Sequence, residues 1–234
     1  MTPLNRTLTE IALVAAPPLL TAAEVIRKYV ALGEVNSGDP LLDARDKILQ
    51  VAAHQDLWLL HSYLAFLGIL AWLAAMLAIT TAVSARRPIL GALGGVLGLG
   101  SAIGFATHLG YYTIPLGASA GMVDQDLDAA ATVWVGNEGD PFLTVMVLFF
   151  IACMLIGQLV LGLGLWRANV APWWAAVCLP LSAALSLEPG AHPTWGLVWL
   201  LPLIPFLFVA HPGPEPSHPR KAASVPAAND AGLR

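Results

Sequence analysis

The sequence predicts an all-α membrane protein, a single bundle of about six transmembrane helices with two amphipathic extracytoplasmic segments. Of its 234 residues, 57% are hydrophobic and 11% are charged, whereas an average soluble domain carries about 25% charged residues. The apolar residues form runs of about 16 to 28 residues, the length that a helix needs to cross about 30 Å of hydrocarbon. A membrane β-barrel would show alternating segments of about ten residues instead.

The predicted spans follow these runs. They cover Ile11–Ile26, Asp56–Val83, Ile89–Thr113, Pro141–Trp166, Pro172–Leu187 and Trp195–Ala210. For the first run the alternative is a cleaved signal peptide, which is disfavoured because its basic region would consist of Arg6 alone. Residues 1–210 are therefore expected to form one transmembrane bundle. Residues 211–234 are rich in Pro, Ala and Ser and are expected to form a disordered cytoplasmic tail.

Two segments between the spans have the periodicity of surface helices. The apolar residues that share a helical face are Leu41, Leu42, Ala44, Ile48, Leu49 and Ala52 in the first, and Val123, Leu127, Ala131 and Trp134 in the second. The second segment contains Asp124, Asp126 and Asp128, which resemble the start of an EF-hand calcium loop. Ala129 and Val135 occupy positions where that loop requires Gly and Glu, so we interpret the aspartates as acidic surface.

The basic residues predict that both termini are cytoplasmic. With this orientation the cytoplasmic segments contain Arg6, Arg86, Arg87, Arg167, Arg220, Lys221 and Arg234, and the outer segments contain Arg27, Lys28, Arg45 and Lys47. The arginines in the two short turns, Arg86, Arg87 and Arg167, are the most informative, because basic residues in short loops decide orientation. We therefore expect a multi-pass protein of the bacterial inner membrane.

Glycine is concentrated in the third predicted span. Gly91 and Gly95, and Gly94 and Gly98, form small-x-x-x-small pairs, which allow helix backbones to approach closely in lipid. Besides the lipid bilayer, other membrane subunits are therefore expected partners, packed against this helix. The sequence has no basic patch for nucleic acid.

Three ionisable side chains, Glu24, His61 and His108, lie within the predicted spans at similar depth. Such groups are costly in a membrane, which makes each one a candidate functional residue. Each lies four or five residues from the outer end of its span, or roughly 6–8 Å below the outer boundary. A tight turn joins the second and third spans, so these are antiparallel neighbours and the two histidines are expected to face each other.

These residues suggest a site for haem or a transition metal, because imidazole is the commonest metal ligand and a carboxylate can complete or orient such a site. Gly68 and Gly104 lie on the histidine faces of their helices and would leave room for a flat ligand. The predicted site consists of His61 and His108 as ligands of haem or metal, Glu24 as a further metal ligand, and His54, Asp56 and His192 behind the ligands or at the entrance.

The sequence leaves three functions open. The first is electron transfer through the predicted site, to or from a quinone. The second is a non-catalytic accessory or scaffolding subunit, in which the histidines only form hydrogen bonds between helices. The third is a small transporter, which is disfavoured because no charged residue lies at mid-membrane depth. Neither His-x-x-x-His nor His-Glu-x-x-His occurs, which argues against a metalloprotease, and no catalytic residue is assigned.

Two remaining features are interpreted as structural. Cys153 and Cys178 fall inside apolar runs without a C-x-x-C pattern, so we expect buried thiols. Gln158 lies in an apolar, Gly-rich span, and we expect its amide to form a hydrogen bond with another helix.

Overall fold

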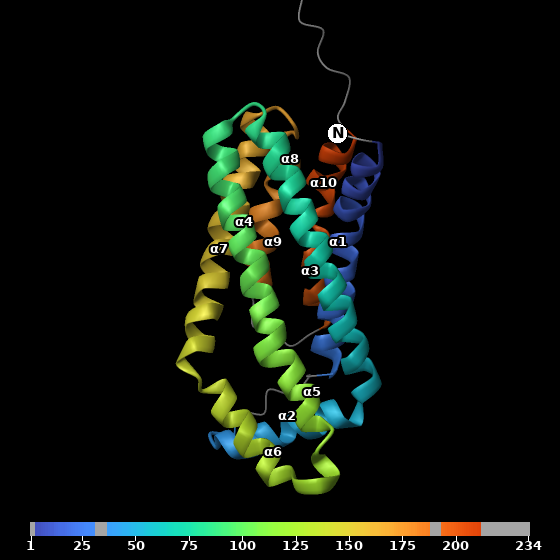
Figure 1. Ribbon diagram of the computed structural model, residues 1–234, viewed down its shortest axis with the longest axis vertical. Helices are drawn as coiled ribbons and strands as arrows, with labels where there is room; N and C mark the ends of the chain where they lie inside the picture. The colour runs from blue at the N-terminus through green and yellow to red at the C-terminus, as the bar shows by residue number, and fades with distance from the viewer. Residues whose placement is uncertain (1–2, 31–36, 188–192, 212–234) are drawn as a thin grey trace, which may run out of the picture.

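The computed structural model describes residues 3–30, 37–187 and 193–211, and every regular element in these ranges is helical (Figure 1). The predicted all-α class is therefore confirmed. Four helical segments are long and apolar enough to cross a membrane. They are α1 (Pro3–Val30), α3 (Gln55–Ser84), the continuous segment α4 (Pro88–His108), η1 (Leu109–Thr113) and α5 (Ile114–Ala120), and α7 (Pro141–Arg167). These segments are compatible with a multi-pass membrane protein.

The fifth and sixth predicted spans form a shorter and less regular hairpin. Its first arm contains α8 (Trp173–Ala176) and α9 (Cys178–Ser186), and its second arm contains the 3₁₀ helix η2 (Pro193–Leu200) and α10 (Leu203–Ala210). The apolar helix of the first arm has fewer than 18 residues, so it rises only about 20 Å. The number of six spans is therefore not established by the lengths of the helices.

The two ends of the bundle differ. At one end, which we call the capped end, α2 (Pro40–Ala53) and α6 (Val123–Glu138) lie across the ends of the long helices, next to α5, at the bottom of Figure 1. The opposite end, which we call the arginine end, contains the start of α1 and the turns with Arg86, Arg87 and Arg167 (Figure 1). The hairpin of α8–α10 occupies the half of the bundle towards the arginine end.

The capped end confirms that both amphipathic segments are helical. Helix α2 begins at Asp39, whose carboxylate accepts a hydrogen bond from the backbone N–H of Leu41, and it buries Ala44, Ile48 and Val51. The buried face is narrower than predicted, because Leu41, like Leu42 and Leu49, is exposed. Hydrogen bonds from Ser37 hold the pKa of Asp43 below its usual value.

Helix α6 packs against α2 and shows the roles of Asp126 and Asp128, two of the three aspartates. Arg45 and Asp128 form an ion pair of 2.7 Å between the two helices, and Lys47 and Glu138 form one of 2.9 Å. Asp126 lies at a kink, where its carboxylate accepts a hydrogen bond from the backbone N–H of Ala129. These contacts agree with our interpretation of the aspartates as surface residues, here with structural roles.

The glycines of α4 pack against other helices of the same chain. A Cβ atom added to Gly94 would lie 2.6 Å from Leu161 of α7, and one added to Gly104 would lie 2.5 Å from Phe150 of α7. On another face, a Cβ added to Gly95 would lie 2.6 Å from Thr80 of α3. These glycines therefore bring α3, α4 and α7 together within one chain, and they are not available as a surface for another subunit.

The turns at the arginine end are held by their own side chains. Arg86 donates a hydrogen bond to the carbonyl oxygen of Ala168, and Arg87 donates one to that of Arg167. Both carbonyls belong to the C-terminal end of α7, where they lack helical partners. The arginines that predict the orientation therefore also join the two turns.

The prediction for the two cysteines is confirmed, whereas the prediction for Gln158 is wrong. Cys153 and Cys178 are buried and free, as predicted. Gln158 is 3% exposed, but neither atom of its amide has a hydrogen-bond partner among the described residues. The predicted hydrogen bond between helices is therefore wrong, and the amide lies among the apolar side chains of the core.

Candidate functional site

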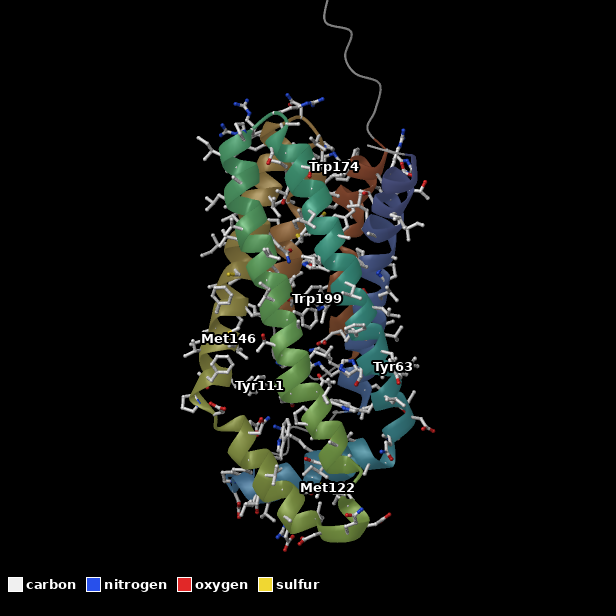
Figure 2. All side chains as sticks on the ribbon, in the orientation of Figure 1. Tyr63, Tyr111, Met122, Met146, Trp174 and Trp199 are labelled. Carbon is white, nitrogen blue, oxygen red and sulfur yellow. The ribbon has the colours of Figure 1, made fainter. Side chains whose placement is uncertain are left out.

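A cavity of about 290 Å³ lies between the long helices and the hairpin of α8–α10. Its lining comes from α1, α3, α4, η1, α7, α9 and η2. The lining includes Glu24, Arg27, His61, Phe105, His108, Phe150, Met154, Ser186 and Trp199. Figure 2 shows Trp199 in the interior, at about the middle of the bundle. Among the described residues of the hairpin, Ser186, Leu187 and Trp199 contribute to this lining.

The first polar group of the cavity is an ion pair within α1. Arg27 donates two hydrogen bonds to the carboxylate of Glu24, of 2.9 Å from Nε and 2.7 Å from Nη2. Side-chain exposures of 20% for Glu24 and 29% for Arg27 show that the pair is mostly buried. Lys28 is 4.0 Å from the same carboxylate. Glu24 is therefore engaged by two cations of its own helix.

The second polar group is His61 of α3, which is 4% exposed. Its Nδ1 lies 2.8 Å from the backbone carbonyl oxygen of Ala23 in α1. A carbonyl oxygen only accepts hydrogen bonds, so Nδ1 must carry the proton, and in the neutral ring Nε2 has a free lone pair. This Nε2 is buried and has no hydrogen-bond partner among the described residues. His61 lines the cavity, so this buried acceptor is the candidate contact for a ligand there.

The third group is His108 at the end of α4, where the chain passes into the π-helical turn η1. Its ring is stacked on that of Tyr112, with centroids 5.0 Å apart and planes 13° from parallel. The structure thus brings Glu24, His61 and His108, on three different helices, to one cavity. This proximity agrees with the expected pairing of the second and third spans.

Two of the remaining candidate residues, His54 and Asp56, lie elsewhere. His54 is exposed, between α2 and α3, with its ring 5.9 Å from that of Tyr29. Asp56 lines a separate groove of about 620 Å³ between α3 and α5, together with Tyr63. His192 falls outside the described residues. Of the three residues expected around the site, neither His54 nor Asp56 lines the cavity.

The positions of Gly68 and Gly104, where room for a flat ligand was expected, are filled by neighbouring side chains. A Cβ on Gly68 would lie 2.7 Å from Leu20, and Gly104 is in contact with Phe150. Neither glycine leaves room for a flat cofactor at its own position. Among the residues that the structure describes, no group of three or more His, Cys, Asp or Glu side chains is placed to hold a metal ion.

Sequence reasoning missed Arg27 and the aromatic residues of the cavity. We counted Arg27 as a basic residue of an outer segment, but α1 continues to Val30 and places it one turn from Glu24. The i,i+3 spacing of these opposite charges was a usable signal. Phe105, Phe150 and Trp199 carry no comparable signal, because only the tertiary structure brings them together.

Known proteins give no further guide to this site. A scan of protein-family models and searches of curated proteins and of solved structures found no match to the chain. The class supported by the fold is an all-helical protein with several apolar helices that suggest contact with a lipid bilayer.

Proposed function

We propose that the protein is a multi-pass protein of the bacterial inner membrane that binds a small ligand in the cavity between Glu24, His61 and His108. The observation that carries this proposal is the orientation of His61. Its Nδ1 is held by the carbonyl of Ala23, and its Nε2 is buried without a partner among the described residues. A buried polar atom without a partner costs free energy. A ligand that donates a hydrogen bond to Nε2 would remove this cost and would therefore bind more tightly.

The charges near the cavity favour a ligand without positive charge. The carboxylate of Glu24 is paired with Arg27 and lies 4.0 Å from Lys28, so it is not free to balance the charge of a cationic ligand. A neutral molecule with a hydrogen-bond donor fits this environment better than a cation. The cavity volume of about 290 Å³ is at the lower end of the range for ligand pockets, about 300–1,000 Å³.

A second candidate is the haem or transition-metal site expected from the sequence, which would act as a redox centre for electron transfer. One observation favours it: histidines that bind metals usually donate their other N–H to a carbonyl or carboxylate, as His61 does. His108 would be the second ligand. The neighbouring cations and the engagement of Glu24 in an ion pair make this candidate weaker than the first.

The alternative of an accessory subunit would need a surface other than the glycines of α4, which already pack against α3 and α7. The transporter alternative has no observation in its favour. We retain the cavity proposal as the function that the geometry supports best.

The test compares three purified proteins in mild detergent: the wild type, His61→Leu and the control His54→Leu, whose side chain is exposed and outside the cavity. We expect mass spectrometry of solvent extracts, elemental analysis or the absorption spectrum to reveal a bound molecule or metal in the wild type and the control. His61→Leu should lose it while keeping the same elution volume. Identical profiles for all three folded proteins would refute the proposal.

The orientation belongs to the same proposal and has its own test. We propose six crossings, with the arginine end in the cytoplasm and the α2/α6 cap outside, because basic residues in short turns remain cytoplasmic. Reporter fusions after Arg87 and Arg167 should read cytoplasmic, and a fusion after Glu138 should read external. The reverse pattern would contradict the orientation, and opposite locations of the two termini would contradict the even number of crossings.

A further inference from the structure

We infer that the ligand of the cavity is the reduced, hydroxyl-bearing form of a single-ring quinol, and that the site discriminates against the oxidised quinone. This inference rests on the proposed function and names its ligand class. It concerns binding alone. It is carried by the hydrogen-bonding state of His61 together with the aromatic lining of the cavity.

The hydrogen-bonding state of His61 selects for a donor. The carbonyl of Ala23 requires the proton on Nδ1, which leaves Nε2 of the neutral ring as an acceptor. A quinol hydroxyl can donate a hydrogen bond to this atom. The carbonyl oxygen of a quinone cannot, and it would place a second lone pair against Nε2 in a buried site. The two redox forms have almost the same shape, so this one atom distinguishes them.

The aromatic lining selects for a flat, apolar body. The rings of Phe105 and Trp199 are stacked, with centroids 5.9 Å apart and planes 21° from parallel. The rings of Phe105 and Phe150 are 5.5 Å apart at 30°. All three residues line the cavity. Side chains of α4, α7 and η2 thus supply aromatic surface against which a ring packs in an offset or edge-on arrangement, while α1 and α3 supply the polar groups.

The charge and volume agree with the same ligand. Glu24 neutralises Arg27 through two hydrogen bonds, so the polar part of the lining does not require an ionised ligand. The volume of about 290 Å³ admits a small ring system. His61 lines the cavity and its Nε2 is a buried acceptor without a partner among the described residues, so one hydroxyl of the quinol is expected to donate a hydrogen bond to it.

The experiment measures calorimetric binding of three probes to the wild-type protein in detergent under anaerobic conditions. The probes are duroquinol, duroquinone and the dimethyl ether of duroquinol, which keeps the ring but has no hydroxyl donor. We expect duroquinol to bind at least tenfold more tightly than either of the others. Because the comparison uses only the wild type, it does not depend on the folding of any variant.

Two variants locate the preference. In His61→Leu the advantage of duroquinol should fall to less than twofold, because the acceptor is gone. In His54→Leu, outside the cavity, it should be retained. Equal affinities of the wild type for quinol and quinone would overturn the inference but not the proposed function, provided that binding still depends on His61. If no probe binds, the inference fails, and the proposed function fails as well only if the wild type and His61→Leu carry the same extracted molecules.

Discussion

Replacing Gly104 with valine is expected to prevent α4 and α7 from packing and to lower the yield of folded protein severely. A Cβ atom at this position would lie 2.5 Å from the Cβ atom of Phe150 and 2.9 Å from its Cα atom. The second atom belongs to the backbone, so the clash is relieved only if the helices separate. Inserting carbon atoms into a packed core typically costs 1–3 kcal/mol, and more where the backbone must shift, so we expect a loss of about 3 kcal/mol or more.

The measurement is thermal unfolding in detergent, followed with a thiol-reactive dye. Cys153 and Cys178, the only cysteines of the sequence, are both buried and react on unfolding. Gly110→Val is the matched control, because a Cβ on Gly110 would meet nothing within 4 Å. Valine is no worse than glycine in a helix, so the control should unfold close to the wild-type temperature. Similar losses in both variants would show that α4 and α7 do not pack at Gly104.

Replacing Glu24 with glutamine is expected to have the second largest effect, because it leaves the guanidinium of Arg27 without its carboxylate partner. Exposed ion pairs contribute about 0–1 kcal/mol, and breaking a buried pair costs about 3–5 kcal/mol. The Glu24–Arg27 side chains are 20% and 29% exposed, so we expect an intermediate loss of about 1–3 kcal/mol. Chemical denaturation in detergent measures this loss.

The matched control is Glu10→Gln, because Glu10 forms a 2.8 Å ion pair with Arg6 on the same helix. Arg6 is 70% exposed, so this variant should lose less than about 1 kcal/mol. The double variant Glu24→Gln with Arg27→Gln should recover part of the loss, since it removes both members of the ion pair. If Glu24→Gln and Glu10→Gln lose the same stability, the ion pair beside the cavity has no special role.

Local sequence patterns predicted the helices better than their ends. The third predicted span was expected to end at Thr113, but its helix continues through η1 and α5 to Ala120. Trp58, near the start of α3, is 3% exposed and donates a hydrogen bond to the carbonyl oxygen of Thr113 in η1. This contact between the start of α3 and η1 extends the buried structure beyond the apolar run.

The candidate site was predictable to a limited extent. Glu24, His61 and His108 stood out because ionisable groups are rare in apolar helices, and the tight turn after α3 placed the two histidines on neighbouring helices. The role of Glu24 was not predictable in the same way. The i,i+3 spacing of Glu24 and Arg27 was its one signal, and the ion pair forms because α1 continues past the apolar run to Val30.

The sequence by itself determined that this protein is helical and which segments form the long helices. Each helix satisfies its own backbone hydrogen bonds, and apolar composition and length are local properties of the chain. The tertiary structure alone decided that the hairpin of α8–α10 is short, which glycine of α4 meets which helix, and that the carbonyl of Ala23 orients His61. These features depend on contacts between residues far apart in the chain, for which neither periodicity nor composition carries a signal.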